Sequence, residues 1–333
     1  MSVKEKNITK ENNELPVISF DDNHPTTKSL IEEVLSGLNK KQKTIPPKFF
    51  YDSKGSKLFD QITQLPEYYP TRTEIGIIKT YRNEMAQCIG KSPVLIELGS
   101  GSSLKVQLLL EGLQPVIYIP IDISRDHLLE SSRSLARYFP DISVHAVCDD
   151  YSSSLSLPDL PQGHPKVAFF PGSSIGNFEP EEALALLQRV ADILGPGGGM
   201  LIGVDLQKDA KILNAAYNDD QNVTSEFNLN LLTRINSETE ADFDITKFYH
   251  HAYYNEKMER IEMHLVSSEA QEVNVNGESF QFQAGESIHT ENSCKYTLQS
   301  FRKMAALAGF ETVKVWTDSK SYFSIHYIEL PKV

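Results

Sequence analysis

The sequence predicts an α/β fold: a doubly wound, mainly parallel sheet that ends in an antiparallel hairpin, with a smaller α+β lobe attached to it. Three observations predict this fold. Strand-length apolar runs alternate with helical segments between about residues 93 and 206, as in parallel sheets that are covered on both faces. Two strand-like runs follow a last helical segment after residue 296. Residues 208–290 break the rhythm, with helical periodicity first and polar–apolar alternation afterwards.

The first 90 residues suggest helices and turns but no central strand. Residues 1–20 are polar and lack periodicity, which predicts a flexible arm. Apolar residues recur at helical spacing over residues 26–38 and 75–89, and a shorter helical piece is expected around 57–65. The connecting stretch FFYDSKGSKLFDQITQLPEYYPTRTE is rich in aromatic and turn residues. We therefore expect it to cover another part of the molecule.

The alternating region is expected to supply the strands of the parallel sheet. These strands lie in PVLIELG, VIYIPIDIS, ISVHAVCDD, KVAFFPG and GGGMLIGVDL. Helices are expected between them in LKVQLLLEGL, at 126–138 and at 180–194. The pattern predicts a parallel sheet of about five strands.

The last third of the chain mixes helices with hairpins. The segment ILNAAYNDDQNVTSEFNLNLLTRINSE has a helical pattern, and the alternating stretch that follows contains an Asn276–Gly277 hairpin turn. TLQSFRKMAALAGF predicts a helix, and ETVKVWTD and YFSIHYIEL predict the terminal strand pair. We expect three units: an arm of residues 1–20, a core of residues 73–207 plus 296–333, and a lobe of residues 21–72 plus 208–295.

Composition excludes several classes of function. No apolar run approaches the roughly 20 residues that a membrane helix needs, and the polar start resembles neither a secretory nor a transit peptide. We therefore expect a cytoplasmic protein with no membrane partner. Cys88, Cys148 and Cys294 are scattered, which argues against a disulfide framework and against a metal site. The formal net charge of −13 argues against a nucleic-acid partner. We expect a monomer.

A glycine-rich turn follows the first predicted strand of the sheet. Glu97, Gly99, Ser100 and Gly101 lie where that strand gives way to a helix, so glycines allow a ligand to approach the backbone. A dinucleotide-binding loop would carry a third glycine where this chain has Leu104. An acid two residues before the first glycine is typical of S-adenosylmethionine (SAM) sites. The turn therefore favours a Rossmann-like, class I SAM methyltransferase core, although a plain tight turn remains an alternative.

The next two strands end in acids. Asp122 lies about 20 residues beyond the loop, where an acid can bind both ribose hydroxyls. Asp150 could accept a hydrogen bond from an adenine amino group, and Tyr151 could pack on the ring. Because parallel strands end at one edge of the sheet, these groups are expected to form one nucleoside site. The terminal hairpin favours a methyltransferase over a dehydrogenase.

The fourth strand ends in PGSSIGNFEP, which contains Gly172 and Asn177. In this fold, that edge faces the reactive methyl group. The Asn177 amide has both a donor and an acceptor, so it can bind the carboxylate or the amine of a substrate. The alternative is that Asn177 only caps the following helix, a role that Glu179 or the surrounding turn could also fill.

Five motifs together resemble a known family. PEYYPTRTE, ELGSGSSLK, PGSSIGNF, NAAYND and HTENSCKY follow one another as in the histidine-specific Nα-methyltransferases of ergothioneine biosynthesis. The resemblance extends from about residue 40 to the end. The FFYD to PTRTE stretch is also similar to fungal tryptophan-derivative N-methyltransferases and to the methyltransferase part of ovothiol enzymes. The resemblance implies a SAM-dependent enzyme that methylates the α-amino group of L-histidine three times, giving hercynine. Methyl transfer from a sulfonium is an in-line displacement, so we expect no metal.

The resemblance also implies roles for individual residues around the substrate. Asn177 matches the family asparagine that binds the amino and carboxylate ends of the substrate. Beyond the resemblance, we expect Gly172 at the same strand end to contact the substrate, and Asn177 and Tyr51 to orient the amine for catalysis while water takes the proton. The other matched residues are Tyr217 on the carboxylate, Tyr51 and Tyr68 lining the pocket, Met263 packed within it, Glu291 and Ser293 reading the imidazole, and Lys105 on the methionine carboxylate of SAM. Two departures are an extended polar N-terminus and CDDY, where the family commonly has a phenylalanine.

Other interpretations remain open at this stage. Tyr51 and Tyr68 could be aromatics of a lobe interface, and Glu291 could be a solvated loop acid. The protein could methylate another aromatic amino acid, such as tryptophan, tyrosine or a derivative. It could also be a catalytically silent SAM-binding partner protein. A dehydrogenase is a third possibility, weakened by the missing third glycine.

Overall fold

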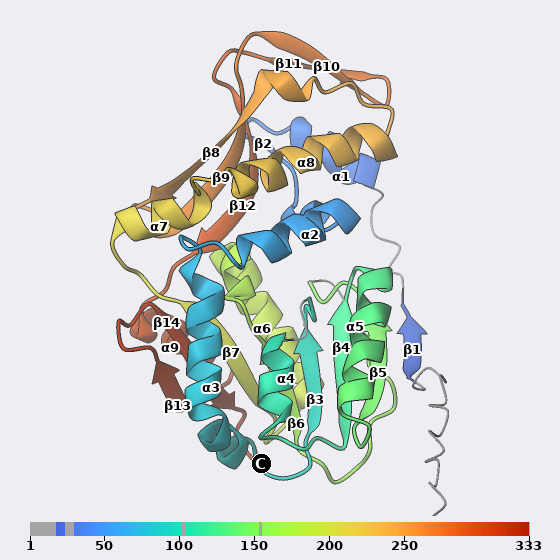
Figure 1. The fold of residues 1–333 in the computed structure, drawn as a ribbon, viewed down its shortest axis with the longest axis vertical. Coiled ribbons are helices and arrows are strands. Elements are labelled where there is room, and N and C mark those ends of the chain that lie inside the picture. The colour runs from blue at the N-terminus through green and yellow to red at the C-terminus, as the bar shows by residue number, and fades with distance from the viewer. Residues whose placement is uncertain (1–17, 24–29, 102–103, 153–154, 333) are drawn as a thin grey trace, which may run out of the picture.

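A computed structural model describes residues 18–23, 30–101, 104–152 and 155–332. Its main feature is an eight-stranded sheet with strand order β1-β5-β4-β3-β6-β7-β14-β13 (Figure 1). The strands are β1 (Ser19–Asp22), β3 (Val94–Leu98), β4 (Ile117–Asp122), β5 (Ser143–Cys148), β6 (Lys166–Phe170), β7 (Gly199–Asp205), β13 (Glu311–Thr317) and β14 (Phe323–Glu329). Strands β1 to β7 in this sheet pair in parallel, whereas β14 pairs antiparallel with both β7 and β13. The predicted fold class is confirmed.

Helices cover both faces of this sheet. On one face the helices are α3 (Tyr69–Ile89), α4 (Leu104–Leu110) and α5 (Arg125–Tyr138), and on the other they are α6 (Pro180–Leu194) and α9 (Leu298–Leu307). Neighbouring residues of β3 point to opposite faces of the sheet, since Leu95 packs with α3 and α4 while Ile96 packs with α6. This double burial explains why β3 reads as a continuous apolar run in the sequence.

A second layer of structure lies above the carboxyl ends of the parallel strands (Figure 1). Its four-stranded sheet has the order β2-β12-β9-β8. The strands are β2 (Lys43–Thr44), β8 (Phe248–Asn255), β9 (Arg260–Ser267) and β12 (Ser287–Cys294), and a separate hairpin pairs β10 (Gln271–Val275) with β11 (Glu278–Phe282). Asn276 and Gly277 form its turn with φ of 49° and 83°, as predicted for a two-residue hairpin loop.

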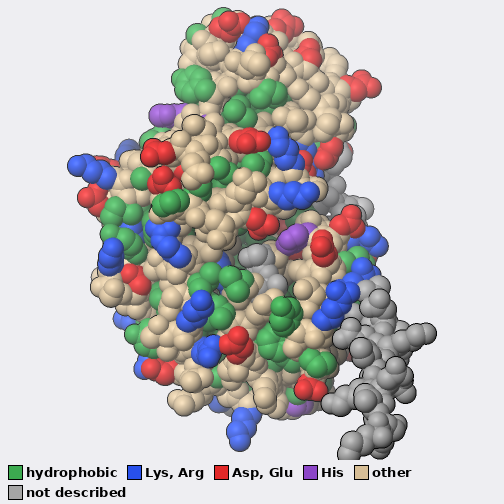
Figure 2. Space-filling model, in the orientation of Figure 1, with side chains coloured by type: hydrophobic (Ala, Val, Ile, Leu, Met, Phe, Trp, Pro, Cys, Tyr) green, Lys and Arg blue, Asp and Glu red, His purple; other side chains and the backbone are tan. Residues whose placement is uncertain are grey.

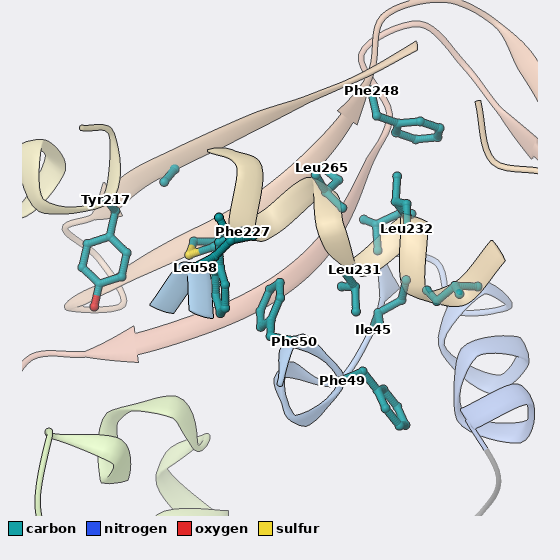
Figure 3. Packing of buried hydrophobic residues seen from close by; sticks show 14 of the residues in the cluster. Ile45, Phe49, Phe50, Leu58, Tyr217, Phe227, Leu231, Leu232, Phe248 and Leu265 are labelled. Carbon is teal, nitrogen blue, oxygen red and sulfur yellow. The ribbon is translucent and has the colours of Figure 1, made fainter. Parts of the chain in front are cut away.

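Helices pack on one face of the four-stranded sheet. They are α1 (Leu30–Leu38), the 3₁₀ turn η1 (Pro47–Phe50), α2 (Ser53–Ile62), α7 (Ala210–Tyr217), α8 (Val223–Glu238) and the 3₁₀ turn η3 (Ile245–Lys247). Figure 3 shows their shared apolar core, in which Phe50 stacks on Phe227 with ring centroids 4.5 Å apart. Tyr217 lies at one end of this core, with its hydroxyl directed away from the phenylalanines (Figure 3).

The structure differs from the sequence expectations in two places. Ser19 and Phe20, assigned to the arm, belong to β1, which pairs with the edge of β5 where Phe20 packs against Ala146. A strand of four residues with one large apolar side chain, such as β1, is too short to show a hydrophobic period in the sequence. The predicted helical stretch after Lys208 is two helices, because Asn222 adopts a left-handed φ of 60° and the Asp219 carboxylate accepts hydrogen bonds at the start of α8.

Some expectations fall on parts of the chain that the structure does not describe. Residues 1–17 of the arm and the first residues of the helix expected at 26–38 lie outside the described residues. The boundaries of core and lobe stay a proposal. Among the described helices, none combines the length and hydropathy that a membrane crossing requires. Acidic and basic side chains are interspersed on the face that Figure 2 shows.

Candidate active site

The glycine-rich turn lies beside two of the predicted nucleoside ligands. Gly99 has a φ of 70°, and a Cβ placed on it would lie 3.5 Å from the Tyr151 ring. The backbone N–H of Gly101 donates to Asp122 Oδ2 at 3.3 Å, and that of Ser124 donates to Oδ1 at 2.8 Å. The Ser100 hydroxyl is buried and finds no hydrogen-bond partner among the described residues. The turn therefore combines close backbone access with an unsatisfied polar atom, as expected of a ligand cradle.

Glu97 is more deeply buried than the sequence suggested. Its carboxyl group accepts a hydrogen bond from the Tyr118 hydroxyl within the core. Burial raises the pKa of Glu97 to about 8, so in this environment the carboxyl group is mostly protonated at neutral pH. A cation placed nearby, such as the ammonium group of a bound amino acid, would favour the ionised form.

Asp150 lies at the same edge but is already engaged. Its Oδ1 accepts hydrogen bonds from the backbone and the hydroxyl of Ser152, and its Oδ2 lies 3.5 Å from Lys48 Nζ. Lys48 belongs to η1 in the second layer. Asp150 therefore links the edge of the parallel sheet to the layer above it.

A buried glutamate that sequence analysis did not single out joins two predicted binding residues. Glu74, on α3, is fully buried; Lys105 Nζ lies 2.6 Å from its Oε2, and the Gly172 N–H donates to both carboxylate oxygens at 2.9 and 3.0 Å. A Cβ on Gly203 of β7 would lie 2.2 Å from Glu74 Oε1, so this contact requires glycine. Glu74 stands in the PTRTE motif, but nothing in its spacing predicts its partners.

Asn177 ends the short 3₁₀ turn η2 (Ser174–Asn177), which follows the left-handed Gly172. Glu179 is the N-cap of α6, and its backbone N–H donates to the Glu182 carboxylate. The capping alternative for Asn177 is therefore wrong. A Cβ on Gly176 would lie 2.8 Å from the Cys294 carbonyl oxygen, so η2 packs directly on the end of β12.

A β-bulge turns Glu291 and Ser293 toward the core. In the register of β12 with β9, Ile288 pairs with Leu265 on the apolar face, and after the bulge Glu291 pairs with Met263 on that same face. Strict alternation from Ile288 would have placed Glu291 on the opposite face. The extra residue therefore puts Glu291, Ser293 and Met263 on one side of the sheet.

A side-chain hydrogen bond to α8 stabilises the bulge. Thr290, which is 1% exposed, donates to Asn228 Oδ1 at 2.9 Å, and it lies 3.1 Å from the Met263 carbonyl oxygen. The fully buried Asn228 amide donates in turn to the His264 carbonyl oxygen at 3.0 Å. These bonds satisfy polar groups that the interrupted ladder would otherwise leave unpaired.

Several of the predicted substrate residues line one small cavity. The cavity measures about 20 Å³, enough for about one water molecule. Its lining includes Tyr68, Tyr217, Met263 and Glu291, and Tyr68 and Tyr217 meet edge to face at 6.1 Å. Burial raises the pKa of Glu291 to about 7. Burial, and then the nearby charge of Glu291, raises the pKa of Tyr51 well above its usual value.

Behind the cavity lies a buried charge network that the sequence did not reveal. Asp205, at the end of β7, lies 2.6 Å from Lys208 Nζ and 2.8 Å from Lys295 Nζ, and it accepts a hydrogen bond of 2.7 Å from Tyr69. Because of the two lysines, the pKa of Asp205 is lowered despite burial. The side chains of Asp205 and Lys295 are each 1% exposed.

One group on the outer face of the four-stranded sheet brings metal-ligating residue types together. The ligand atoms of Glu262, His264 and His289 lie within 4.8 Å of one another. The two imidazole rings stack at 4.7 Å with planes 15° apart, so their nitrogen lone pairs lie in near-parallel planes and do not converge. Glu262 also accepts hydrogen bonds from Arg260 and Tyr253. The arrangement is that of a hydrogen-bonded aromatic stack.

These features agree with comparisons with known proteins. The profile of a family described as histidine-specific, SAM-dependent methyltransferases matches residues 30–330. The chain belongs to this family. Histidine N-alpha-methyltransferase from Mycobacterium tuberculosis is 40% identical over 303 residues, which cover 89% of this chain and 94% of that protein. Ergothioneine biosynthesis protein 1 from Neurospora crassa is 34% identical over 84% of this chain and 32% of its own length.

A third relative bears on substrate choice. The 4-dimethylallyltryptophan N-methyltransferase of Claviceps purpurea is 31% identical over 62% of this chain and 63% of its own length. Family membership makes the protein a SAM-dependent methyltransferase with a small-molecule substrate and sets aside the dehydrogenase interpretation.

Proposed function

We propose that the protein converts L-histidine to Nα,Nα,Nα-trimethylhistidine, hercynine, by three successive methyl transfers from SAM. The observation that carries this proposal is the pair formed by Glu291 and Ser293 on the inner face of β12. A carboxylate and a hydroxyl on one side of a strand can address the two nitrogens of an imidazole. An indole or phenyl ring would cover the half-buried Glu291 carboxylate without offering it a hydrogen-bond donor, at a cost in binding free energy.

Residues at the edge of the parallel sheet fit SAM. Asp122 would accept hydrogen bonds from the ribose hydroxyls, and Gly99 to Gly101 would lie along the ligand, with the buried Ser100 hydroxyl available as a partner. Asp150 and Tyr151 would address the adenine, while Glu97 and Lys105 would bind the methionine end. When bound, SAM supplies an electrophilic methyl group on a sulfonium sulfur.

The chain's own residues orient the amine. Asn177 and Gly172 leave the end of β6 beside β12, where they can bind the amino and carboxylate groups together with Tyr217. Burial raises the pKa of Tyr51 and of Tyr68, so both keep their phenolic protons at neutral pH. These tyrosines therefore orient the amine and do not serve as its base. A free α-amine has a pKa of about 8, and the carboxylate of a zwitterionic amino acid raises it further, so the site must select the neutral amine, with water taking the proton.

The cavity must widen before it can take the substrate. A space of about 20 Å³ does not hold an imidazole ring, so the aromatic side chains around it must move apart when histidine enters. Tyr51 and Tyr68 come from segments before α2 and α3, whereas Glu291 comes from β12. Substrate binding would therefore require segments that are far apart in the chain to move together. We also propose that the enzyme acts in the cytoplasm, as a monomer and without a metal.

A second candidate is the methylation of a tryptophan derivative, which the Claviceps purpurea relative favours. Glu291 distinguishes the two candidates, because a tryptophan-reading pocket would need an apolar residue there. Silent SAM binding is a third alternative, which the same assay tests.

The test is to incubate the protein with SAM and each of the twenty amino acids, and to follow the masses of the products. We expect histidine alone to gain one, two and three methyl groups. Histamine lacks the carboxylate and is expected to be a very poor substrate. Asn177→Ala should abolish most activity while S-adenosylhomocysteine still binds. Tryptophan as the preferred substrate, or no product from any amino acid, would refute the proposal.

A further inference from the structure

Lys295 directly follows β12 and is completely buried against the proposed substrate pocket. Its ammonium group lies 2.8 Å from Asp205 Oδ2, 2.7 Å from Ser293 Oγ and 3.4 Å from Tyr217 Oη. An ammonium group has three N–H donors and accepts nothing. All three donors of Lys295 are therefore used, and two of them end on residues of the pocket.

These contacts restrict the Ser293 hydroxyl. Its oxygen accepts one hydrogen bond from Lys295 and a second, of 2.8 Å, from the Tyr217 hydroxyl. A hydroxyl oxygen has two acceptor positions and one proton. With both acceptor positions filled, the proton of Ser293 has no acceptor in this network and can be donated to a group that binds beside Glu291, on the same face of β12.

We propose that Lys295 is a positioning residue that fixes Ser293 as a hydrogen-bond donor to the substrate. This inference rests on the proposed function and specifies how the imidazole is read. Glu291 accepts the ring N–H, and Ser293 donates to the unprotonated ring nitrogen. The pocket then selects the neutral imidazole, because an imidazolium ion would present a second N–H to a serine whose acceptor positions are occupied.

The charge of Lys295 acts on Glu291 as well. The titratable groups around this carboxyl group are Lys295 after β12, Tyr51 after η1, Tyr68 before α3 and Tyr217 at the end of α7. The tyrosines are neutral near pH 7, so Lys295 is the charge that opposes the effect of burial on the Glu291 pKa. Its removal should raise the Glu291 pKa further and move the acidic limb of kcat/KM for histidine to higher pH.

Lys208 offers a matched control. It is 4% exposed and pairs with the same Asp205 carboxylate at 2.6 Å, but its other hydrogen bonds go to Tyr69 and to the Leu206 carbonyl. Lys208→Met and Lys295→Met therefore remove the same charge from the same cluster. Only Lys295→Met removes a donor to Ser293.

The first experiment measures steady-state kinetics of the full-length variants, after wild-type activity on histidine has been established. Loss of one oriented, charge-assisted hydrogen bond is expected to raise KM for histidine about tenfold in Lys295→Met, with little change in Lys208→Met. Calorimetric affinity for S-adenosylhomocysteine should be unchanged in both. In a Ser293→Ala background, and at a pH high enough to ionise Glu291 in every variant, Lys295→Met should add little, because its remaining effect acts through Ser293. Additive effects, or equal effects of the two lysine variants, would overturn the proposal.

The second experiment uses the wild-type protein, so it does not depend on the folding of a variant. 1,2,4-Triazol-3-ylalanine has a ring that stays neutral and keeps both an N–H and an acceptor nitrogen, and we expect it to be methylated. The two carbon-linked isomers, pyrrol-2-ylalanine and pyrrol-3-ylalanine, keep an N–H but have no acceptor nitrogen, and we expect a loss of at least about tenfold in kcat/KM. If Ser293 instead donates to Tyr217 and accepts from an imidazolium, the triazole will be rejected, and the inference fails while the proposed function stands.

Discussion

Replacing Thr290 with valine removes one buried hydroxyl and keeps the shape of the side chain. In the protein this hydroxyl joins the bulge of β12 to Asn228 on α8, with an Oγ1 to Oδ1 distance of 2.9 Å. Both residues are buried, so water cannot replace the lost donor. A buried polar group left unpaired costs about 1–3 kcal/mol, and we expect the free energy of unfolding to fall by that amount. KM for histidine should rise too, because Glu291 directly follows Thr290.

Urea unfolding followed by circular dichroism measures the first effect, and steady-state kinetics measures the second. Thr80→Val is the control, because the Thr80 hydroxyl donates to the Gly76 carbonyl oxygen at 2.8 Å on an exposed face of α3. Water can replace that bond, so the control should change the unfolding free energy by no more than about 0.5 kcal/mol. If Thr290→Val matched the wild type in both assays, the hydroxyl would not be what holds the bulge.

Three further predictions concern the two halves of the site. Glu291→Ala, combined with Met263→Val to make room, should lower kcat/KM for histidine and raise it for tryptophan. Wild-type values for both substrates would show that Glu291 does not determine substrate specificity. Asp122→Ala should weaken S-adenosylhomocysteine binding by about 1.5–3 kcal/mol in calorimetry, because it loses charge-assisted hydrogen bonds. Burial raises the pKa of Glu97 to about 8, so this group is protonated near pH 7 before a ligand ammonium arrives. Ligand binding should then release a proton, which appears as a binding enthalpy that depends on the ionisation enthalpy of the buffer; buffer-independent enthalpies, or no change in this dependence in Glu97→Gln, would contradict it.

Much of the fold could be predicted because its strands are buried on both faces. Strand β3 and the four parallel strands that follow it along the chain appear as apolar runs, and the helices between them have clear periods. Strand β1 could not be predicted, since its pairing depends on the exposed edge of β5 and on one phenylalanine, Phe20. The break between α7 and α8 depends on local capping by Asp219, which an otherwise continuous helical pattern conceals.

Some parts of the candidate site could likewise be predicted from the sequence, and others could not. The glycine turn and Asp122 could be found because parallel strands bring their carboxyl ends to one edge. The inward direction of Glu291 follows from a bulge that breaks the alternation of its strand, so residue spacing alone predicts the wrong face. Lys295 and Asp205 are 90 positions apart in the printed sequence, and their contact depends on how the two sheets meet. The roles assigned to the individual site residues stay predictions.

Gly203 has no side chain and lies in the middle of the buried strand β7, yet its small size determines the position of the Glu74 carboxylate. Any side chain there would have to displace the Glu74 carboxylate, which lies 2.2 Å from the position of a Cβ. That shift would take an acceptor from the Gly172 backbone and a partner from Lys105. In a saturation mutagenesis screen scored by activity, position 203 should therefore tolerate no replacement, alanine included. It should be as intolerant as Asp122, whereas its strand neighbour Ile202 should accept other aliphatic residues.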